Sequence, residues 1–181
     1  MNKLKDKIAN FLLKRARKSI ADKLMNLKFK SYQNAKNILL IAYPRNAEEV
    51  KHLENFEKQQ KKEGKHVTIA VFSQLKDKQP ILKFPENFIT FSKKDYDWLG
   101  RPKAEEVKKL FSQNFDILID LNFNHIFALE YISQLSLAAF KVGKFSEKAK
   151  EQFDFMIEMK KEQRDYQYFL NNSINYLKKI N

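Results

Sequence analysis

Short, continuous apolar runs alternate with amphipathic stretches along the chain from residue 37 onward. An apolar run of roughly four to eight residues is typical of a strand buried on both faces, whereas apolar residues at helical spacing indicate a helix with one buried side. The predicted strands span residues 37–43, 67–72, 88–91, 115–121, 138–142 and 153–159, and the predicted helices span residues 46–63, 104–113, 126–135 and 166–180.

Strands that alternate with helices in this way form βαβ units, in which the strands are parallel and helices cover both faces of the sheet. We therefore predict an α/β protein with a single doubly wound, Rossmann-like, mostly parallel sheet. Asn46 is a candidate N-cap, and Gly64 ends the helix that starts there. This region shows no internal repeat and no low-complexity linker, so residues 37–181 are expected to form one Rossmann-like domain.

Residues 3–28 are rich in good helix formers and contain neither Gly nor Pro, which predicts a helix. Their apolar positions do not form one straight stripe, because those of the second half lie about 100° further round than those of the first. We expect the second half to pack on the domain, and whether the first ten residues project stays open. Residues 1–36 are thus predicted to be a basic helical extension.

The net charge of +13 is concentrated in this extension. Residues 1–36 contain eleven Lys or Arg and two Asp, a balance of 11 − 2 = +9, which leaves 13 − 9 = +4 for the remainder of the chain. Such asymmetry usually indicates a polyanionic partner or an anionic surface. We favour RNA over a membrane surface, since the apolar positions drift around the helix and include only one aromatic residue, Phe11.

Several classes of site are excluded by composition. Without cysteine there is no disulfide, thiolate nucleophile or Cys-based zinc site, and the spacing of the three histidines suggests no metal site. The chain has three glycines and no glycine-rich phosphate motif, while Glu48 and Glu49 occupy the helix start after the first strand. We expect no cofactor and no metal.

No run approaches the roughly 20 apolar residues of a membrane span, and basic residues interrupt any signal-peptide core, so a cytoplasmic protein is expected.

A distinctive loop at residues 95–103 holds the only Trp of the chain. Trp98 would stack on a base while Arg101 and Lys103 bind phosphates. The alternative is that Trp98 plugs the end of the sheet and Pro102 positions the next helix. The predicted RNA-binding residues are Lys14, Arg15, Arg17, Lys18, Arg101 and Lys103, with Trp98 for stacking.

Asp120 and His125 are weak catalytic candidates, because they flank the end of a predicted strand and ligands bind at the carboxyl ends of strands in open α/β sheets. Together they would form a general-base pair. In the alternative interpretation, which we favour, Asn124 caps the following helix, Asp120 accepts hydrogen bonds from loop amides, and His125 is a surface residue.

Residues 37–145 resemble the N-terminal domain of the ADP-heptose lipopolysaccharide heptosyltransferases. The likeness lies in N-I-L-L-I at 37–41, F-D-I-L-I-D-L at 115–121 and S-L-A-A-F-K-V-G at 136–143. It implies the Rossmann-like fold, but those enzymes hold the nucleotide-sugar in a second domain, and their glycine-containing turn is replaced here by Y-P-R-N at 43–46. The whole chain is also similar to an uncharacterised family of short Bacteroidetes-type α/β proteins, through W-L-G-R-P-K at 98–103 and the 115–121 motif.

The predicted function is that of a non-enzymatic, cytoplasmic RNA-binding or ribosome-associated accessory protein. Its basic N-terminal helix would contact phosphates. Two alternatives remain open: a glycosyltransferase-like ligand-binding or catalytic domain that uses Asp120, His125 and Trp98, and a module that docks a protein partner.

Overall fold

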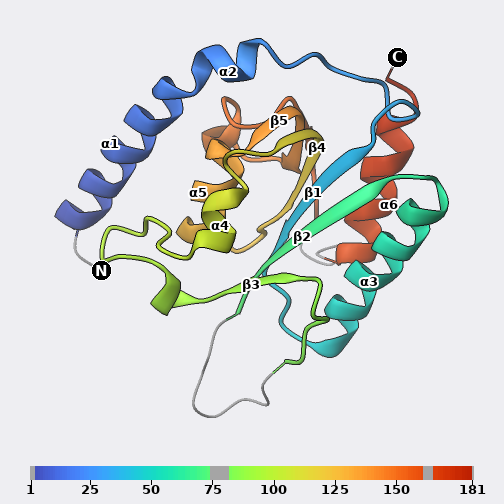
Figure 1. Ribbon diagram of the computed structural model, residues 1–181, viewed down its shortest axis with the longest axis horizontal. Helices are drawn as coiled ribbons and strands as arrows, with labels where there is room; N and C mark the ends of the chain where they lie inside the picture. The colour runs from blue at the N-terminus through green and yellow to red at the C-terminus, as the bar shows by residue number, and fades with distance from the viewer. Residues whose placement is uncertain (1–2, 74–81, 161–164, 181) are drawn as a thin grey trace.

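The computed structural model describes residues 3–73, 82–160 and 165–180. It contains a six-stranded sheet in the order β3-β2-β1-β4-β5-β6, in which all neighbouring strands are parallel (Figure 1). This confirms the predicted α/β fold with a doubly wound sheet. The strands are β1 (Asn37–Ala42), β2 (His66–Phe72), β3 (Ile89–Phe91), β4 (Asn114–Leu121), β5 (Leu137–Lys144) and β6 (Phe155–Ile157).

Two helices cover each face of the sheet. The helices are α3 (Ala47–Lys62), α4 (Glu105–Lys109), α5 (Phe127–Leu135) and α6 (Tyr166–Leu177), with short 3-10 turns η1 (Lys93–Asp95) and η2 (Glu147–Ala149). Helices α3 and α6 pack on one face, against a core that includes Leu40 and Ile119. Helices α4 and α5 pack on the other, against Leu39 and Leu118. Adjacent strand residues thus contribute to opposite cores, which explains why the central strands are apolar on both faces apart from Asp116 and Asp120 in β4.

Local capping fixes where the helices begin and end. The amide of Glu49 donates to Asn46 Oδ1 at 2.8 Å, which confirms Asn46 as the N-cap of α3. Gly64 follows the C-terminal end of α3 with a φ of 72°, a conformation that glycine adopts without steric cost. Asp165 caps α6 by accepting from the amides of Gln167 and Tyr168.

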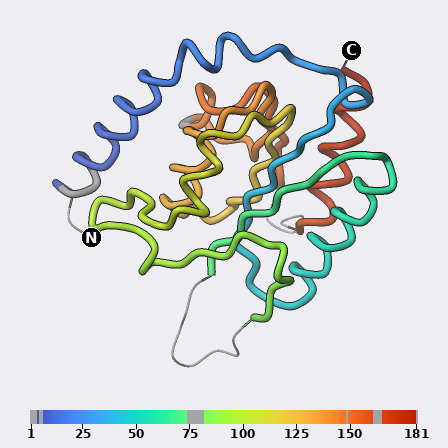
Figure 2. The backbone as a smooth tube through the Cα atoms, viewed as in Figure 1, coloured from blue at the N-terminus to red at the C-terminus, as the bar shows by residue number. Residues whose placement is uncertain are grey.

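The N-terminal segment forms two helices, α1 (Lys3–Ser19) and α2 (Ala21–Met25), so the single helix predicted over residues 3–28 is interrupted at Ile20. Helix α1 packs against α5, and α2 packs against β5. The chain then crosses the molecule to reach the C-terminal end of α6 before it enters β1 (Figure 2). Tyr32 anchors this crossing, since its ring is buried and lies 4.6 Å from Lys65 Nζ and 5.4 Å from Lys178 Nζ.

Among the described residues, no helix combines the length and the apolar composition that crossing a membrane requires.

Candidate functional site

Two places at the carboxyl edge of the sheet are candidate ligand sites: the switch point between β1 and β4, and the region above β4 and β5. The switch point is nearly closed, because its cavity measures only about 30 Å³ and is walled by Arg45, Leu121, Phe123, Asn124 and Tyr166. Tyr166 Oη accepts a hydrogen bond from the amide of Tyr43 at 3.0 Å, and the Tyr166 and Phe123 rings meet edge to face. This crevice therefore offers no room for a nucleotide.

The start of α3, beside the switch point, already holds an anion. Glu49 is only 5% exposed, and it accepts hydrogen bonds from the amide of Arg45 at 2.7 Å and from Arg45 Nε at 3.0 Å. Its carboxylate occupies the positive end of the helix dipole, where a phosphate would otherwise bind. The position of Glu49 therefore agrees with the sequence-based argument against a phosphate site here.

A cavity of about 720 Å³ opens above the ends of β4 and β5. Helix α1 closes one side of it with Asn10, the β4–α5 loop and α5 form another, and the segment that follows β5 completes it. Its lining residues are Asn10, Asp120, Asn122, His125, Glu130, Lys144, Ser146, Glu147, Ala149, Gln152 and Phe153. Both catalytic candidates identified in the sequence, Asp120 and His125, are therefore in this cavity, which we call the β4–β5 pocket.

Asp120 is the most buried acidic group of this pocket, with an exposed fraction of 5%. Burial raises the pKa of Asp120 to about 7, although a hydrogen bond from the Asn122 amide to Oδ1, at 2.7 Å, stabilises the ionised form and opposes the increase. Near neutral pH the carboxyl is therefore present in both protonation states, as a group that accepts and returns a proton requires.

His125 lies across the same pocket in a strained backbone conformation, with a φ of 53°. Its Nδ1 is 3.5 Å from Glu130 Oε1, and its side chain is exposed. In the described part of the chain, no hydrogen bond or ion pair joins His125 to Asp120. The two residues share the pocket without forming the general-base pair that we considered.

The predicted capping role of Asn124 is wrong. Helix α5 begins after the N-cap residue Ile126, and none of the described side chains caps it. Asn122 holds the main chain of Ile126 in place: its Oδ1 accepts from the amide at 2.8 Å, and its Nδ2 donates to the carbonyl at 3.0 Å. The side chain of Asn124 is exposed. The other two parts of that interpretation are confirmed, because Asp120 accepts from a loop amide and His125 is at the surface.

Lys141 lies in β5, and no sequence motif identifies it as a functional residue. Burial lowers the pKa of Lys141 to about 8. Its Nζ donates to the carbonyl oxygens of Ser133 at 2.8 Å and Gln134 at 3.3 Å, at the end of α5, where a cation is favoured by the helix dipole. Lys141 thus binds the C-terminal end of α5 to the sheet.

Gly143, also in β5, makes room for one wall of the pocket. A Cβ atom at this position would lie 2.5 Å from ring carbons of Phe153, well inside van der Waals contact. The absence of a side chain lets the Phe153 ring pack directly on the strand.

The predicted RNA-binding residues of α1 do not all point the same way. Helix α1 buries Ala9 and Leu13 against the body, while Lys14, Arg15 and Lys18 are exposed. Arg17 is turned inward: its Nη1 lies 4.0 Å from Glu151 Oε2, and Nη2 donates to the main-chain oxygen of Glu151. We define the outward face of α1 as Leu4, Lys7, Ile8, Phe11, Lys14, Arg15 and Lys18.

The loop that follows β3 is organised around Asp97. This carboxylate accepts from the amides of Leu99 and Arg101 at 2.9 and 3.0 Å, and from Arg101 Nε at 2.6 Å. Trp98 is 65% exposed, so the alternative in which it plugs the sheet is wrong. Lys103 is exposed, but Trp98, Arg101 and Lys103 do not line the β4–β5 pocket.

The three histidines lie apart from one another: His52 is 3.7 Å from Asp165, His66 opens β2, and His125 is at the pocket. Within the described residues, no three His, Asp or Glu side chains are placed to hold a metal ion.

Comparison with known proteins places nearly the whole chain in one family. The model of a family of unknown function matches residues 5–180. None of the curated proteins and none of the solved structures compared with the chain matches it. The resemblance to heptosyltransferases therefore gains no support, and the site must be interpreted from its own geometry.

Proposed function

Since the chain belongs to the DUF6913 family, whose function is unknown, we propose a function from the geometry alone: the protein binds RNA through the outward face of α1. The observation that carries this proposal is the placement of Lys14, Arg15 and Lys18. All three are exposed on a helix whose opposite side is anchored by the buried Leu13, and no ion pair engages them within the described residues. Three unneutralised cations on a fixed helix suit a polyphosphate backbone.

The surrounding residues support RNA more than a bilayer. Along the outward face, the apolar side chains Leu4, Ile8 and Phe11 lie in the first half of the helix beside Lys7, and the second half is basic throughout. A helix that lies in a membrane interface needs an apolar face along its length. On an RNA, by contrast, Phe11 at 65% exposure would stack on a base while the following turns meet phosphates.

The loop after β3 offers a second contact of the same chemistry. Trp98 and Lys103 are both exposed, which suits stacking and phosphate binding. Arg101 is held by Asp97 and would contribute less. We assign Arg17 to fastening α1 to residue Glu151 rather than to RNA. The proposal places the protein in the cytoplasm, on single-stranded RNA or on a ribonucleoprotein particle.

A glycosyltransferase-like activity stays an alternative with less support. It would use Asp120, His125 and Trp98 together, but Trp98 is not part of the pocket that contains the other two. A ligand-binding role of the pocket itself does not need Trp98.

The test is fluorescence anisotropy of a short single-stranded RNA titrated with the full chain over a range of salt concentrations. The variant Lys14→Gln/Arg15→Gln/Lys18→Gln should bind at least about 10-fold more weakly at low salt. The dependence of log affinity on log salt concentration should also be less steep than in the parent protein. Each lost phosphate contact lowers the magnitude of this slope by about 0.7, so three lost contacts should lower it by about 2.

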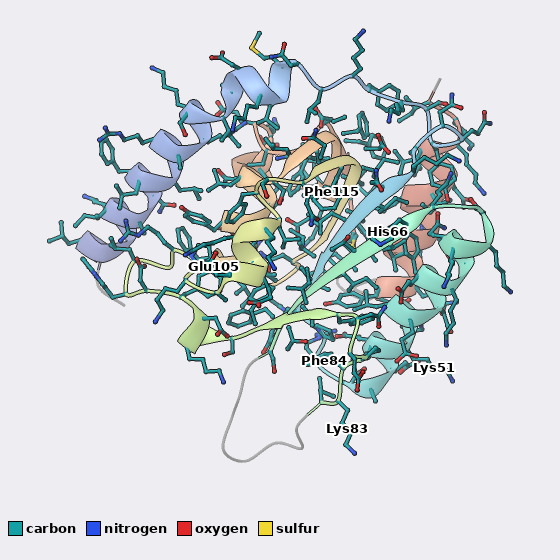
Figure 3. The ribbon with its side chains drawn as sticks, viewed as in Figure 1. Lys51, His66, Lys83, Phe84, Glu105 and Phe115 are labelled. Carbon is teal, nitrogen blue, oxygen red and sulfur yellow. The ribbon has the colours of Figure 1, made fainter. Side chains whose placement is uncertain are left out.

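A matched control removes the same charge from the other side of the molecule, through Lys51→Gln/Lys61→Gln/Lys62→Gln on α3. Lys51 projects from α3, across the sheet from α1 (Figure 3). This variant should keep the affinity within about 2-fold. The proposal is overturned if both variants lose affinity equally or if the parent protein binds no RNA at low salt. It is also overturned if the protein binds anionic vesicles instead of RNA and this binding depends on Leu4, Ile8 and Phe11.

A further inference from the structure

The β4–β5 pocket has a charge opposite to that of the protein as a whole. The chain carries a net charge of +13, yet the pocket is lined by three carboxyl groups against one lysine and one histidine. Unlike the outward face of α1, for which we propose RNA, this pocket does not suit a phosphate-containing ligand, because its carboxylates would repel phosphates. The pocket is therefore distinct in chemistry from the outward face of α1.

The three carboxyl groups at the cavity differ in their cationic neighbours. Glu147 pairs with Lys150 at 2.6 Å, and Glu130 lies beside His125 at 3.5 Å. No ion pair reaches Asp120 within the described residues. This side chain is more than nine-tenths buried and lines the cavity; the Asn122 amide donates to Oδ1, the Ser133 hydroxyl also favours the ionised form, and Lys141 contributes charge without forming an ion pair. A buried carboxylate is costly unless a donor or a cation compensates it.

We propose that the β4–β5 pocket binds a small organic amine, with the ligand's ammonium group at Asp120. An ammonium group supplies three hydrogen-bond donors and a positive charge. Ser146, Asn10 and Gln152 line the same cavity and offer further oxygen acceptors. The volume of about 720 Å³ is that of a small-molecule site, and most of the residues that line it have polar side chains.

Other charged groups around Asp120 set the conditions under which the amine binds. Glu130 on α5 and Glu147 in η2 add negative charge, and Lys141 and Lys144 on β5 add positive charge, while the imidazole of His125 in the β4–α5 loop lines the same cavity. Ionisation of Asp120 strengthens its attraction for an ammonium group. Because burial raises the pKa of Asp120 to about 7, amine affinity should increase as the pH rises from 6 to 8.

The test is calorimetric titration of the full chain, free of RNA, with putrescine, butanediol and succinate. These probes have the same number of carbon atoms and differ in charge. Putrescine should bind at least about 10-fold more tightly than either of the others, and Asp120→Asn should weaken putrescine binding at least about 10-fold. Glu106→Gln, which removes an exposed carboxylate on α4 outside the pocket, should leave binding unchanged.

A second measurement does not depend on a variant. Carbon-13 NMR of the Asp120 carboxyl in the unaltered chain should show its pKa falling when putrescine is added. The proposal is overturned if butanediol binds as well as putrescine, if Asp120→Asn binds putrescine normally, or if the pKa of Asp120 does not respond. Since RNA is absent from these titrations, their outcome is independent of RNA binding by α1.

Discussion

Lys30 and Asp116 form an ion pair between the N-terminal segment and β4, with Nζ 2.7 Å from Oδ1. The second oxygen of Asp116 accepts from the amides of Lys36 and Asn37 at 2.7 and 2.9 Å. The Asp116 carboxylate thus holds the segment that enters β1, and this segment connects the basic helices α1 and α2 to the sheet.

Replacing Asp116 should weaken this attachment. Partial burial would raise the pKa of Asp116, but hydrogen bonds from Lys30 and from the amides of Asn37 and Lys36 outweigh it, so the pKa lies below its usual value. The stabilisation is therefore present above about pH 4 and is lost as the pH falls through the folded-state pKa. Asp116→Ala should lower the free energy of unfolding at pH 7 by about 1–3 kcal/mol.

Urea unfolding at pH 7 and at pH 3 measures this effect. Lys30→Ala is the control, because the lysine is half-exposed and its removal should cost less than about 1 kcal/mol. If Asp116→Ala lowers the free energy of unfolding by the same amount at pH 3 as at pH 7, the charge of the carboxylate is not the source of the stabilisation.

Asp120→Asn should increase stability at high pH. The folded-state pKa of Asp120, about 7, lies above the unfolded value near 4, so the folded protein binds more protons between these values and its stability falls as the pH rises through them. Asparagine does not ionise and avoids this loss. Thermal unfolding should show the variant more stable than the parent at pH 8 and similar to it at pH 4.5; a constant difference at both pH values would contradict the assignment.

Asn122→Ala should be more damaging than Asn124→Ala. Asn122 makes two hydrogen bonds to the main chain of Ile126, whereas Asn124 is exposed and makes no side-chain hydrogen bond in the described part of the structure. We expect losses of about 1–2 kcal/mol and less than about 0.5 kcal/mol in the free energy of unfolding, respectively. Urea denaturation of the two variants measures the difference, and equal losses would show that the two hydrogen bonds of Asn122 do not contribute to stability.

Gly143→Ala should destabilise the fold by about 1–3 kcal/mol, since its methyl group would overlap the Phe153 ring unless the ring moves. The double variant Gly143→Ala/Phe153→Leu should recover part of this loss, because the smaller side chain frees the space. Guanidinium unfolding of the two single variants and the double variant forms a cycle. Strictly additive losses would mean that the two residues do not compete for the same volume.

The order of strands and helices was predictable because their signals are local. Residues 37–43 and 115–121 are mostly apolar and lie at the centre of the sheet in β1 and β4, and Asn46 caps α3 from a position that sequence alone identifies. A parallel sheet buried on both faces leaves few other arrangements for such runs.

Contacts between residues far apart in sequence were not predictable. Arg17 has the same local sequence environment as its basic neighbours, but the placement of α1 turns it toward Glu151. Asn10 has no motif and becomes part of the pocket only because α1 packs beside α5. Lys141 interrupts an apolar strand, and its role depends on where the carbonyl groups at the end of α5 come to lie.

The packing of Phe153 on Gly143 should constrain how these two positions vary among related proteins. If the shape of this wall is inherited across DUF6913, the two positions should change together in other members: a side chain larger than hydrogen at the first should accompany a smaller residue at the second. An alignment of the family would then show, at this pair of positions, which members keep the pocket wall seen here and which have changed it.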